Sequence, residues 1–474
     1  MITTISHNRE DMRKLFGTDG IRGTANKYPL TIDVCLNLAE ALLIKFCREK
    51  DRTKQKDSGN NIVVIGKDTR ISCDIFEHAI AARLASLGAC VKLIGVCPTP
   101  AISILTKVMN ADFGIMISAS HNPFSDNGIK IFNKRGLKLT DHDEEEIEEI
   151  MEQICCNNYH DEKNIIGDKV GHVKYTSEEL KLYTDKIKNS FSFDKSISGK
   201  TKIALDTSNG SFSKIAPQIF RDFGFCVVND YDFPNGININ EHCGVTNPQT
   251  ISSMTTNNNA DVGIAFDGDG DRLLLCDEQG RFLDGDHILA ILAKSENLKH
   301  TEIVSTIMSN FGLEKHLKEK DIKLIRTKVG DRYISEYMQQ TPEAIFGGEP
   351  SGHIIIKEHA PTGDGLFAAL KILDYVVKSG KKVSELYEIF KPYPVVSCNI
   401  RVSDKDVISK AEISDKIEEY KNQLLNRGKL IVRASGTEPL IRVSAEGEDK
   451  QELEDIVANI RRIIENDGII RNAK

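Results

Sequence analysis

Three stretches of the chain share one pattern of apolar and polar positions: an apolar run, a polar turn and an amphipathic helical segment. They are "NIVVIGKDTRIS" followed by "CDIFEHAIAARLASLG", "TKIALDTSNGSFSKIAPQIFRDFG" near 201–224, and "TEIVSTIMSNFGLEKHLKEK" near 301–320. Buried runs of β-branched residues that alternate with amphipathic helices are typical of parallel or mixed sheets covered by helices. The pattern therefore predicts an α/β protein with three such domains in series.

The pattern changes at "KPYPVVSCNIRV", where two prolines precede strands that alternate with helices such as "SKAEISDKIEEYKNQLLNRG". We expect a smaller α+β domain there. The predicted boundaries are 1–168, 169–280, 281–389 and 390–474. The acidic segment "DHDEEEIEEIMEQI" is expected to be a helix whose charged face is solvated.

Composition narrows the class of protein. With 474 residues the chain is too long for one ordinary core, and 40% hydrophobic and 28% charged residues are typical of a globular protein. A net charge of −8 argues against a nucleic-acid partner. The eleven cysteines form no CxxC pair, and no apolar run approaches the ~18 residues that span a bilayer. We therefore expect a cytoplasmic protein with reduced thiols and no membrane partner.

The stretch "DVGIAFDGDGDRLLLCDEQG" carries the sharpest chemical signal. Asp267, Asp269 and Asp271 alternate with glycines, so in an extended backbone their carboxylates point to one side. Three carboxylates at one spot need a hard divalent cation, and this predicts a Mg²⁺ site on a strand-to-strand loop. An EF-hand is the alternative, because Glu278 falls at its twelfth position, but Arg272 stands where that loop needs glycine. Arg272 beside a metal also suits an anionic ligand.

In "MISASHNPFSDNGIKIF" a predicted strand ends in a run of turn-forming residues. Ser118 and Ser120 are both candidates for a displayed hydroxyl, and the pattern alone does not separate them. A serine that hydrogen-bonds within its own turn is the favoured reading, since a hydroxyl nucleophile needs a base or a metal. Lys130 could move the proton, and the Asp-rich loop could bring the metal.

Two further loops are rich in small polar residues. "FGGEPSGHIII" sets Glu349, Ser351 and His353 at alternate positions, which suits either a grip on sugar hydroxyls or a simple turn. "VRASGTEPLIRV" offers the parts of a phosphate cradle, guanidinium, hydroxyls and free backbone N–H groups. The residues of that cradle are Arg433, Ser435, Gly436 and Thr437.

Two arginines stand in weaker motifs, Arg22 in "FGTDGIRG" and Arg70 in "GKDTRIS". Each motif alone indicates only a turn with a solvent-exposed arginine. Their value depends on the motifs around them.

Taken together and in this order, "FGTDGIRG", "SASHNP", "DGDGDR", "GGEPSGH" and "RASGTEP" resemble the α-D-phosphohexomutase superfamily, from about residue 15 to 450. Within it, the stretches "FGTDGIRG", "ISASHNPFSDNGIKIF", "PTGDG" and "SGTEPLIRV" are most similar to those of the bacterial phosphoglucosamine mutases. The resemblance implies a four-domain architecture around a central cleft, with three similar mixed-sheet α/β domains and a smaller C-terminal α+β domain.

The resemblance also implies a mechanism. Ser120 is expected to be a phosphoserine that donates its phosphoryl group to a sugar monophosphate and regains one from the resulting bisphosphate. Mg²⁺ would be bound by Ser120 with Asp267, Asp269 and Asp271.

The other motif residues receive roles by the same resemblance. Lys130 matches the general acid/base, and Arg22 and His121 match residues that line the same site. Arg272, Glu349, Ser351 and His353 are expected to bind the sugar. Arg433, Ser435, Gly436 and Thr437 are expected to hold the phosphate that is not transferred.

The expected activity is the interconversion of glucosamine 6-phosphate and glucosamine 1-phosphate, which supplies precursors for UDP-N-acetylglucosamine and the cell wall. Catalytic hexosamine 1,6-bisphosphate or glucose 1,6-bisphosphate would prime the enzyme. The sequence does not decide whether the protein is a homodimer. The alternatives are a phosphomannomutase/phosphoglucomutase, a Mg²⁺-dependent phosphatase and a non-catalytic sugar-phosphate binder. Pro350 and Asn247 depart from the family's usual motifs and leave the choice of sugar open.

Overall fold

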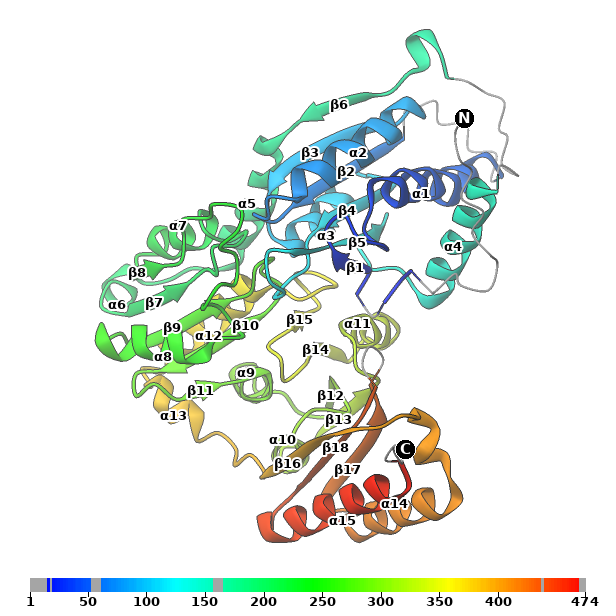
Figure 1. Ribbon diagram of the computed structural model, residues 1–474. Helices are drawn as coiled ribbons and strands as arrows, with labels where there is room; N and C mark the ends of the chain where they lie inside the picture. The colour runs from blue at the N-terminus through cyan, green and yellow to red at the C-terminus, as the bar shows by residue number, and fades with distance from the viewer. Residues whose placement is uncertain (1–14, 18, 53–60, 157–164, 436–438, 469–474) are drawn as a thin grey trace. The chain divides into compact units, whose positions relative to one another are not determined.

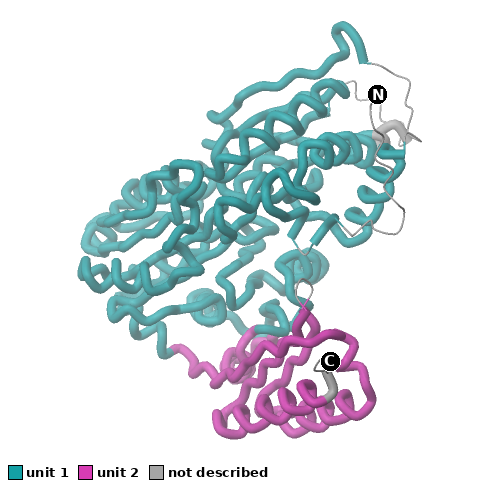
Figure 2. Tube along the Cα trace, in the orientation of Figure 1, with its two compact units in different colours: residues 1–308, 325–388 teal, residues 309–324, 389–474 magenta. Residues whose placement is uncertain are grey.

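The computed structural model describes residues 15–17, 19–52, 61–156, 165–435 and 439–468 (Figure 1). The chain forms two compact units (Figure 2). The first comprises Met1–Met308 with Ile325–Glu388, and the second comprises Ser309–Leu324 with Ile389–Lys474.

The first sheet of the first unit has six strands in the order β1-β5-β4-β2-β3-β6. The strands are β1 (Ile21–Thr24), β2 (Ile62–Lys67), β3 (Cys90–Val96), β4 (Phe113–Ile117), β5 (Asp126–Asn133) and β6 (His172–Tyr175). β5 is antiparallel to both of its neighbours, whereas β4, β2, β3 and β6 are mutually parallel. The sheet is therefore mixed, as the pattern predicts.

Helices cover both faces of this sheet. They are α1 (Ile32–Arg52), α2 (Cys73–Ser86), α3 (Thr99–Val108) and α4 (Asp141–Cys155). Residues of α1, α2 and α4 share a core with alternate strand residues such as Val63 and Ile65. α3 packs against β2 and β4 where Gly66 and Gly114 leave room, because a Cβ at either position would collide with α3.

The second sheet has five strands in the order β11-β10-β9-β7-β8. The strands are β7 (Lys202–Asp206), β8 (Cys226–Asp230), β9 (Val262–Phe266), β10 (Leu273–Asp277) and β11 (Phe282–Leu283). Its helices are α5 (Leu180–Ser190), α6 (Lys195–Ser198), α7 (Ile215–Asp222) and α8 (Pro248–Asn257), preceded by the 3₁₀ turns η1 (Gly167–Lys169) and η2 (Ser177–Glu179). β9 and β10 are antiparallel and pair from Phe266 opposite Leu273, so the residues between them form a tight turn.

The third sheet has the order β13-β12-β14-β15. The strands are β12 (Thr301–Thr306), β13 (Ile322–Thr327), β14 (Ala344–Gly348) and β15 (Ile354–Ile356). The helices of this region are α9 (Gly285–Ser295), α10 (Phe311–Lys318), α11 (Asp331–Gln340), α12 (Gly365–Ser379) and α13 (Val383–Tyr387). Asp284 and Asp364 cap α9 and α12 by accepting backbone N–H groups of the first turn.

The second unit contains a three-stranded antiparallel sheet in the order β16-β18-β17. Its elements are β16 (Val395–Arg401), η3 (Lys405–Ser409), α14 (Ala411–Gln423), β17 (Gly428–Ala434), β18 (Leu440–Gly447) and α15 (Lys450–Gly468). The unit also includes α10, and its apolar core is formed by α14, α15 and the sheet. This is the α+β arrangement that the sequence predicts for the C-terminal region.

The three repeated strand–helix units of the sequence are confirmed as β2 with α2, β7 with α7, and β12 with α10. The four domain boundaries stay predictions. The acidic helix α4 is solvated along much of its charged face, where Asp141, Glu145 and Glu149 are exposed. Glu144 is the exception to the prediction, because it is buried and pairs with Arg332. Glu148 also accepts the backbone N–H groups of Leu15 and Phe16.

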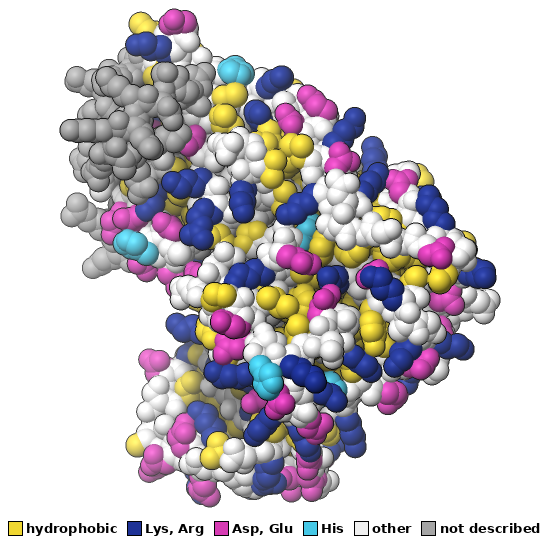
Figure 3. Space-filling model, turned by 180° about the vertical axis from the view of Figure 1, so that it is seen from behind, with side chains coloured by type: hydrophobic (Ala, Val, Ile, Leu, Met, Phe, Trp, Pro, Cys, Tyr) yellow, Lys and Arg dark blue, Asp and Glu magenta, His cyan; other side chains and the backbone are white. Residues whose placement is uncertain are grey.

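The surface is mixed in charge on the face shown in Figure 3, where Lys and Arg side chains are interspersed with those of Asp and Glu. The eleven cysteines are all free. Among the described residues, no helix has the length and apolarity needed to cross a membrane.

Candidate active site

The three aspartates of the predicted metal loop lie in the turn between β9 and β10, and all three are buried. The N–H of Gly270, which has φ +73°, donates to the carbonyl of Asp267 at 3.1 Å and closes the turn. One carboxylate oxygen from each aspartate lies within 4.8 Å of the others. The strand-to-strand loop is as predicted, but the carboxylates converge because the chain turns, not because it is extended.

This Asp triad fits a cation on its own chemistry. Oδ1 of Asp269 and Oδ1 of Asp271 are buried and have no hydrogen-bond partner among the described residues. Buried carboxylate oxygens without partners are costly, and hard divalent cations prefer oxygen ligands. The flanking elements are strands, which rules out the EF-hand, and Glu278 accepts hydrogen bonds from Ser384.

Ser120 follows β4 and lies directly against this triad. Ser120 Oγ donates to Asp267 Oδ2 at 2.5 Å, and Nδ1 of His121 lies 3.4 Å from Ser120 Oγ. Ser118 has a different task, since its Oγ accepts the backbone N–H of Ser120 at 2.8 Å. The structure thus separates the two serines that the sequence pattern leaves equivalent.

The backbone of Ser120 is held in the left-handed region, with φ +54°, a conformation that L-residues rarely adopt. Its carbonyl accepts hydrogen bonds from Arg70 at 3.0 Å and from Asn240 at 2.9 Å. A Cβ at Gly268 would come within 2.7 Å of the same carbonyl oxygen, so only glycine allows this approach.

The guanidinium of Arg70 also donates to three further carbonyls of the loop, those of Asn122, Pro123 and Asp126. Arg70 is therefore buried and structural, and not the solvent-exposed arginine that its motif alone indicates.

Lys130 reaches the triad from β5. Its Nζ lies 2.7 Å from Asp269 Oδ2, 2.8 Å from Asp271 Oδ2 and 3.3 Å from Asp19 Oδ2. Burial alone would lower the pKa of Lys130, but the three carboxylates outweigh it and raise the pKa well above its usual value. Lys130 is therefore an ammonium that neutralises part of the triad's charge.

Two arginines, Arg22 and Arg272, add positive charge near the Asp triad. Arg22 donates to the carbonyl of Ala119 at 3.3 Å and pairs with Asp19. The Nε atoms of Arg22 and Arg272 are buried and, within the described residues, have no hydrogen-bond partner, so each guanidinium keeps a free donor. Burial, with the charges of Arg272 and Arg22, lowers the pKa of His121 to about 4, so its ring is neutral near pH 7.

The predicted sugar loop lies between β14 and β15. Glu349 Oε1 accepts the N–H of Gly330 at 3.2 Å, and the hydroxyl of the exposed Ser351 lies 3.5 Å from Glu349 Oε2. His353 does not join them at a common surface, because it is buried between the carboxylates of Asp271 and Asp331. The His353 Nδ1–Asp271 Oδ1 distance is 3.6 Å and the Nε2–Asp331 Oδ2 distance is 3.0 Å.

His353 is therefore a cation. Burial would lower the pKa of His353, but Asp331 and Asp271 outweigh it and raise the pKa to about 10. The N–H of Gly363 also lies 3.0 Å from Nε2, a contact that needs the neutral ring. Two carboxylates on a buried imidazole outweigh one amide N–H, so the charged form prevails.

The predicted phosphate loop belongs to the second unit. Arg433 lies on β17 opposite Arg442 of β18, which places two guanidinium side chains on neighbouring strands. Ser435 is buried, its N–H donates to the carbonyl of Leu440 at 2.8 Å, and its carbonyl accepts from Lys405 Nζ at 2.6 Å. Gly436 and Thr437 lie outside the described residues.

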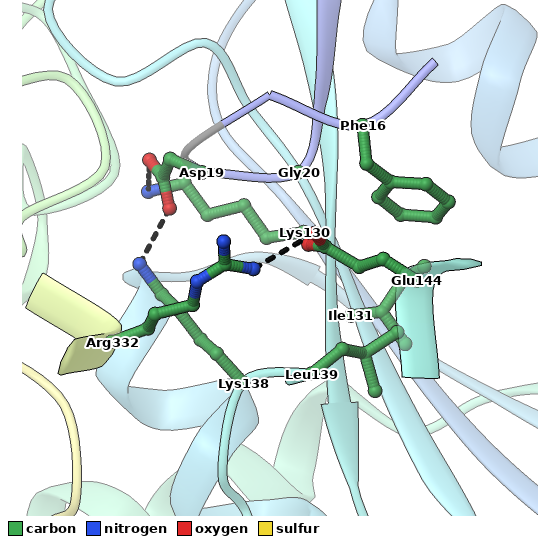
Figure 4. A pocket seen from close by; sticks show the side chains of 9 residues that line it. All are labelled: Phe16, Asp19, Gly20, Lys130, Ile131, Lys138, Leu139, Glu144 and Arg332. Atoms are coloured by element: carbon green, nitrogen blue, oxygen red, sulfur yellow. Dashed lines mark hydrogen bonds and ion pairs between the residues drawn. The ribbon is translucent and has the colours of Figure 1, made fainter. Parts of the chain in front are cut away.

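The sequence patterns do not point to three charged residues that lie near the Asp triad, namely Asp19, Lys138 and Asp331. Lys138 Nζ lies 2.5 Å from Asp19 Oδ1 and 2.7 Å from Asp331 Oδ2, and the link from Asp19 to Lys138 and Lys130 can be followed in Figure 4. Asp19 lies within "FGTDGIRG", so this motif could have identified it as a candidate site residue. Lys138 and Asp331 lie 193 positions apart, and no spacing rule connects them.

Comparison with known families places all four regions of the chain. Family models described as phosphoglucomutase/phosphomannomutase match residues 13–156 (α/β/α domain I), 181–280 (domain II), 284–393 (domain III) and 398–463 (C-terminal domain).

Relatives and solved structures are similar over nearly the whole chain. A phosphoglucosamine mutase of Sinorhizobium medicae is 42% identical and covers 97% of this chain and 99% of its own length. One from Zymomonas mobilis is 41% identical over 94% and 98%, respectively. A crystal structure of a phosphoglucomutase/phosphomannomutase family protein from Burkholderia thailandensis has a TM-score of 0.78 at 21% identity, covering 97% and 98% of the two chains. The N-acetylphosphoglucosamine mutase of Aspergillus fumigatus, solved with GlcNAc-6P and magnesium, has a TM-score of 0.64 at 16% identity, covering 96% of each chain.

Proposed function

The chain belongs to the phosphoglucosamine mutases of the α-D-phosphohexomutase superfamily, and from that membership we propose how its site interconverts glucosamine 6-phosphate and glucosamine 1-phosphate. The protein is an isomerase that moves a phosphoryl group between two oxygens of one sugar. Such an enzyme needs a group that stores the phosphoryl between two transfers, and charges that neutralise it.

The observation that carries the proposal is the hydrogen bond from Ser120 Oγ to Asp267 at 2.5 Å. It holds a serine hydroxyl at the edge of a buried carboxylate triad, where a metal and a phosphoryl group would meet. We assign Ser120 as the phosphoserine. A serine that only stabilised its turn would have no reason to face the triad, and Ser118 already supplies that turn hydrogen bond.

Protons and bonds balance over two transfers. In the first, the Ser120 Oγ–P bond breaks, the bond from phosphorus to the sugar hydroxyl oxygen forms, and the hydroxyl proton ends on Ser120 Oγ. In the second, Ser120 Oγ takes the other phosphoryl group of the sugar bisphosphate, and its proton ends on the sugar oxygen that is released. Lys130 is assigned as the acid/base: its ammonium gives a proton to Ser120 Oγ as the Oγ–P bond breaks and receives the proton of the sugar hydroxyl in exchange. Its positive charge also neutralises charge at the triad.

The metal set is Asp267, Asp269 and Asp271 with the phosphorylated Ser120. Oδ1 of Asp269 and Oδ1 of Asp271 support this assignment, because neither accepts a hydrogen bond within the described residues. The ion pair of Asp271 Oδ1 with His353 Nδ1 is long, at 3.6 Å. Mg²⁺ is the proposed ion, and when bound it would neutralise phosphoryl charge in the transition state. The free Nε donors of Arg22 and Arg272 support the same task from protein groups. The neutral ring of His121 lies beside Ser120, with Nδ1 3.4 Å from Oγ.

The remaining assignments concern the ends of the substrate. Glu349 and Ser351 have the exposure and the acceptor and donor groups to contact sugar hydroxyls and the amino group. The loop that contains Arg433 and Ser435 is assigned to the phosphate that is not transferred, because its guanidinium and backbone suit an anion. Glucose 1,6-bisphosphate or hexosamine 1,6-bisphosphate is proposed as the primer that first phosphorylates Ser120.

A coupled assay with glucosamine 6-phosphate, Mg²⁺ and catalytic glucose 1,6-bisphosphate tests the proposal. Wild type should form glucosamine 1-phosphate, and intact mass should show a phosphoryl increment of ~80 Da, the mass of the group that phosphorylation adds. Ser120→Ala should lose both signals, whereas Ser118→Ala should keep the increment. Phosphorylation that survives Ser120→Ala would overturn the assignment.

The rival activity within the superfamily acts on mannose or glucose phosphates. Measured kcat/KM values for the glucosamine, glucose and mannose phosphates compare transition-state binding directly. A preference for mannose phosphate would replace the proposed substrate. Stoichiometric release of inorganic phosphate would instead indicate a phosphatase.

A further inference from the structure

Six charged side chains of the first unit form a closed ring in which positive and negative groups alternate. In order they are Lys130, Asp19, Lys138, Asp331, His353 and Asp271, and Asp271 contacts Lys130 again. The successive distances are 3.3, 2.5, 2.7, 3.0, 3.6 and 2.8 Å. We call this set the charge ring.

The members of the charge ring come from the regions of all three sheets of the first unit. Asp19, Lys130 and Lys138 come from the region of the first sheet, Asp271 from the β9–β10 turn, and Asp331 and His353 from the region of the third sheet. Only Lys130 and Asp271 belong to the proposed chemistry at Ser120. The other members connect those two residues along the far side of the ring.

The ring is shielded from water. Lys130, Asp271 and His353 are almost fully buried. The side chains of Lys138 and Asp331 are about one-tenth exposed, and that of Asp19 is one-fifth exposed. A pocket beside the ring is lined on its apolar side by Phe16, Ile131 and Leu139 (Figure 4). Ion pairs in such surroundings interact more strongly than in water, and removing one partner leaves the other charge buried and uncompensated.

We propose that the charge ring positions the Lys130 ammonium at the Asp triad, and that Lys138 and Asp331 are positioning residues for the reaction. Within the described residues, neither hydrogen-bonds to the triad or to Ser120. Lys138 fixes Asp19, which contacts Lys130, and Asp331 fixes His353, which contacts Asp271. The proposal rests on the proposed function, because it assigns these residues to the reaction at that site.

The test compares four variants with wild type in the glucosamine 6-phosphate assay. Lys138→Met and Asp331→Asn should each lower kcat about 100-fold, the loss expected when reacting groups shift by about 1 Å. KM should stay within about twofold, because sugar contacts are retained. Lys138→Arg keeps a cation between the two carboxylates and should restore much of kcat.

Arg332→Met is the matched control. Arg332 follows Asp331 on α11 and lines the same small pocket as Lys138, but its guanidinium pairs with Asp141 and Glu144 of α4. Within the described part of the chain, no ion pair or hydrogen bond joins its side chain to a member of the charge ring. Its loss should lower the melting temperature while kcat changes little. An equal loss of kcat in Arg332→Met and Lys138→Met would overturn the proposal, since the effect would then be one of packing between α11 and α4.

A crystal structure of Lys138→Met gives a readout that does not depend on activity. Lys130 Nζ should move away from its 2.7 and 2.8 Å contacts with Asp269 and Asp271. If Lys130 does not move in the variant, the proposed positioning role of the charge ring is wrong, whichever sugar the wild type acts on. An inactive wild type with a displaced Lys130 in the variant would count against the proposed function alone.

Discussion

Ser118 accepts the backbone N–H of Ser120 through its side-chain oxygen, at 2.8 Å. One serine of the motif therefore fixes the backbone of the other, and only Ser120 turns its hydroxyl to the Asp triad. The two hydroxyls are two residues apart in the chain and have separate tasks.

Ser118→Ala should weaken the fold more than the chemistry. The change leaves the buried N–H of Ser120 without its partner, which costs about 1–3 kcal/mol. Urea unfolding should show that loss, while phosphorylation of Ser120 persists and kcat falls less than in Ser120→Ala. If Ser118→Ala is as inactive as Ser120→Ala and unaltered in stability, Ser118 has a chemical role that the structure does not give it.

Arg70→Lys should destabilise the serine loop although the charge is kept. Lysine cannot reproduce a guanidinium that donates to the carbonyls of Ser120 and Asn122 and pairs with Asp68 at 2.9 Å. We expect a loss of about 2–4 kcal/mol in the free energy of unfolding, typical of breaking a buried network. Arg83→Lys is the control, since Arg83 pairs with Glu40 at the surface and should change stability by less than about 1 kcal/mol.

Asp206 should make the fold less stable as pH rises. Burial raises the pKa of Asp206 to about 7. The hydrogen bonds that its carboxylate accepts from the N–H groups of Gly244 and Ser208 lower the pKa, but burial outweighs them. The folded state therefore binds a proton that the unfolded state has lost, so the free energy of unfolding falls between about pH 4 and 7 and is flat above. The full effect is at most about 4 kcal/mol, from the pKa difference between the two states.

Asp206→Asn should flatten that slope, because the amide does not titrate. Urea unfolding of both proteins at half-unit steps from pH 5 to 8 measures the difference. Parallel curves for wild type and variant would show that Asp206 is already ionised in the folded state at pH 5.

The cysteines should fall into two classes of reactivity. Burial raises the pKa of Cys35 to about 12 and of Cys276 to about 11, and it raises the pKa of Cys97 and Cys243 further. Brief treatment of the native enzyme with iodoacetamide at pH 8, read by peptide mass spectrometry, should leave these four unmodified. The exposed Cys156 and Cys226 should be alkylated. Rapid labelling of Cys97 or Cys243 would reveal local opening of their surroundings.

The sequence predicts the parts of the site that lie within short motifs. The aspartates of the β9–β10 turn and the serine after β4 are close along the chain to glycines and turn residues, so local pattern alone places them on loops. Asp331 could not be found this way, because its role depends on Lys138, and the two meet only through the packing of α11 against the first sheet's region.

The orientation of side chains was also beyond the sequence. Glu349, Ser351 and His353 alternate as residues on one side of an extended segment would, yet His353 is buried while Ser351 is exposed. The backbone turns at Gly352, which has φ +91°, and this breaks the period of two. Likewise, Glu144 reads as one of many surface acids until Arg332 is brought to it by the fold.

The doubly held carbonyl of Ser120 has one further consequence. Arg70, Asn240 and the close approach of Gly268 hold the backbone of Ser120, the proposed phosphoserine, in one place. On the proposed assignment the acceptor is stationary, and exchange between the two ends of a sugar then requires the sugar itself to turn. The proposed intermediate, and not the serine, would be the moving part of the reaction.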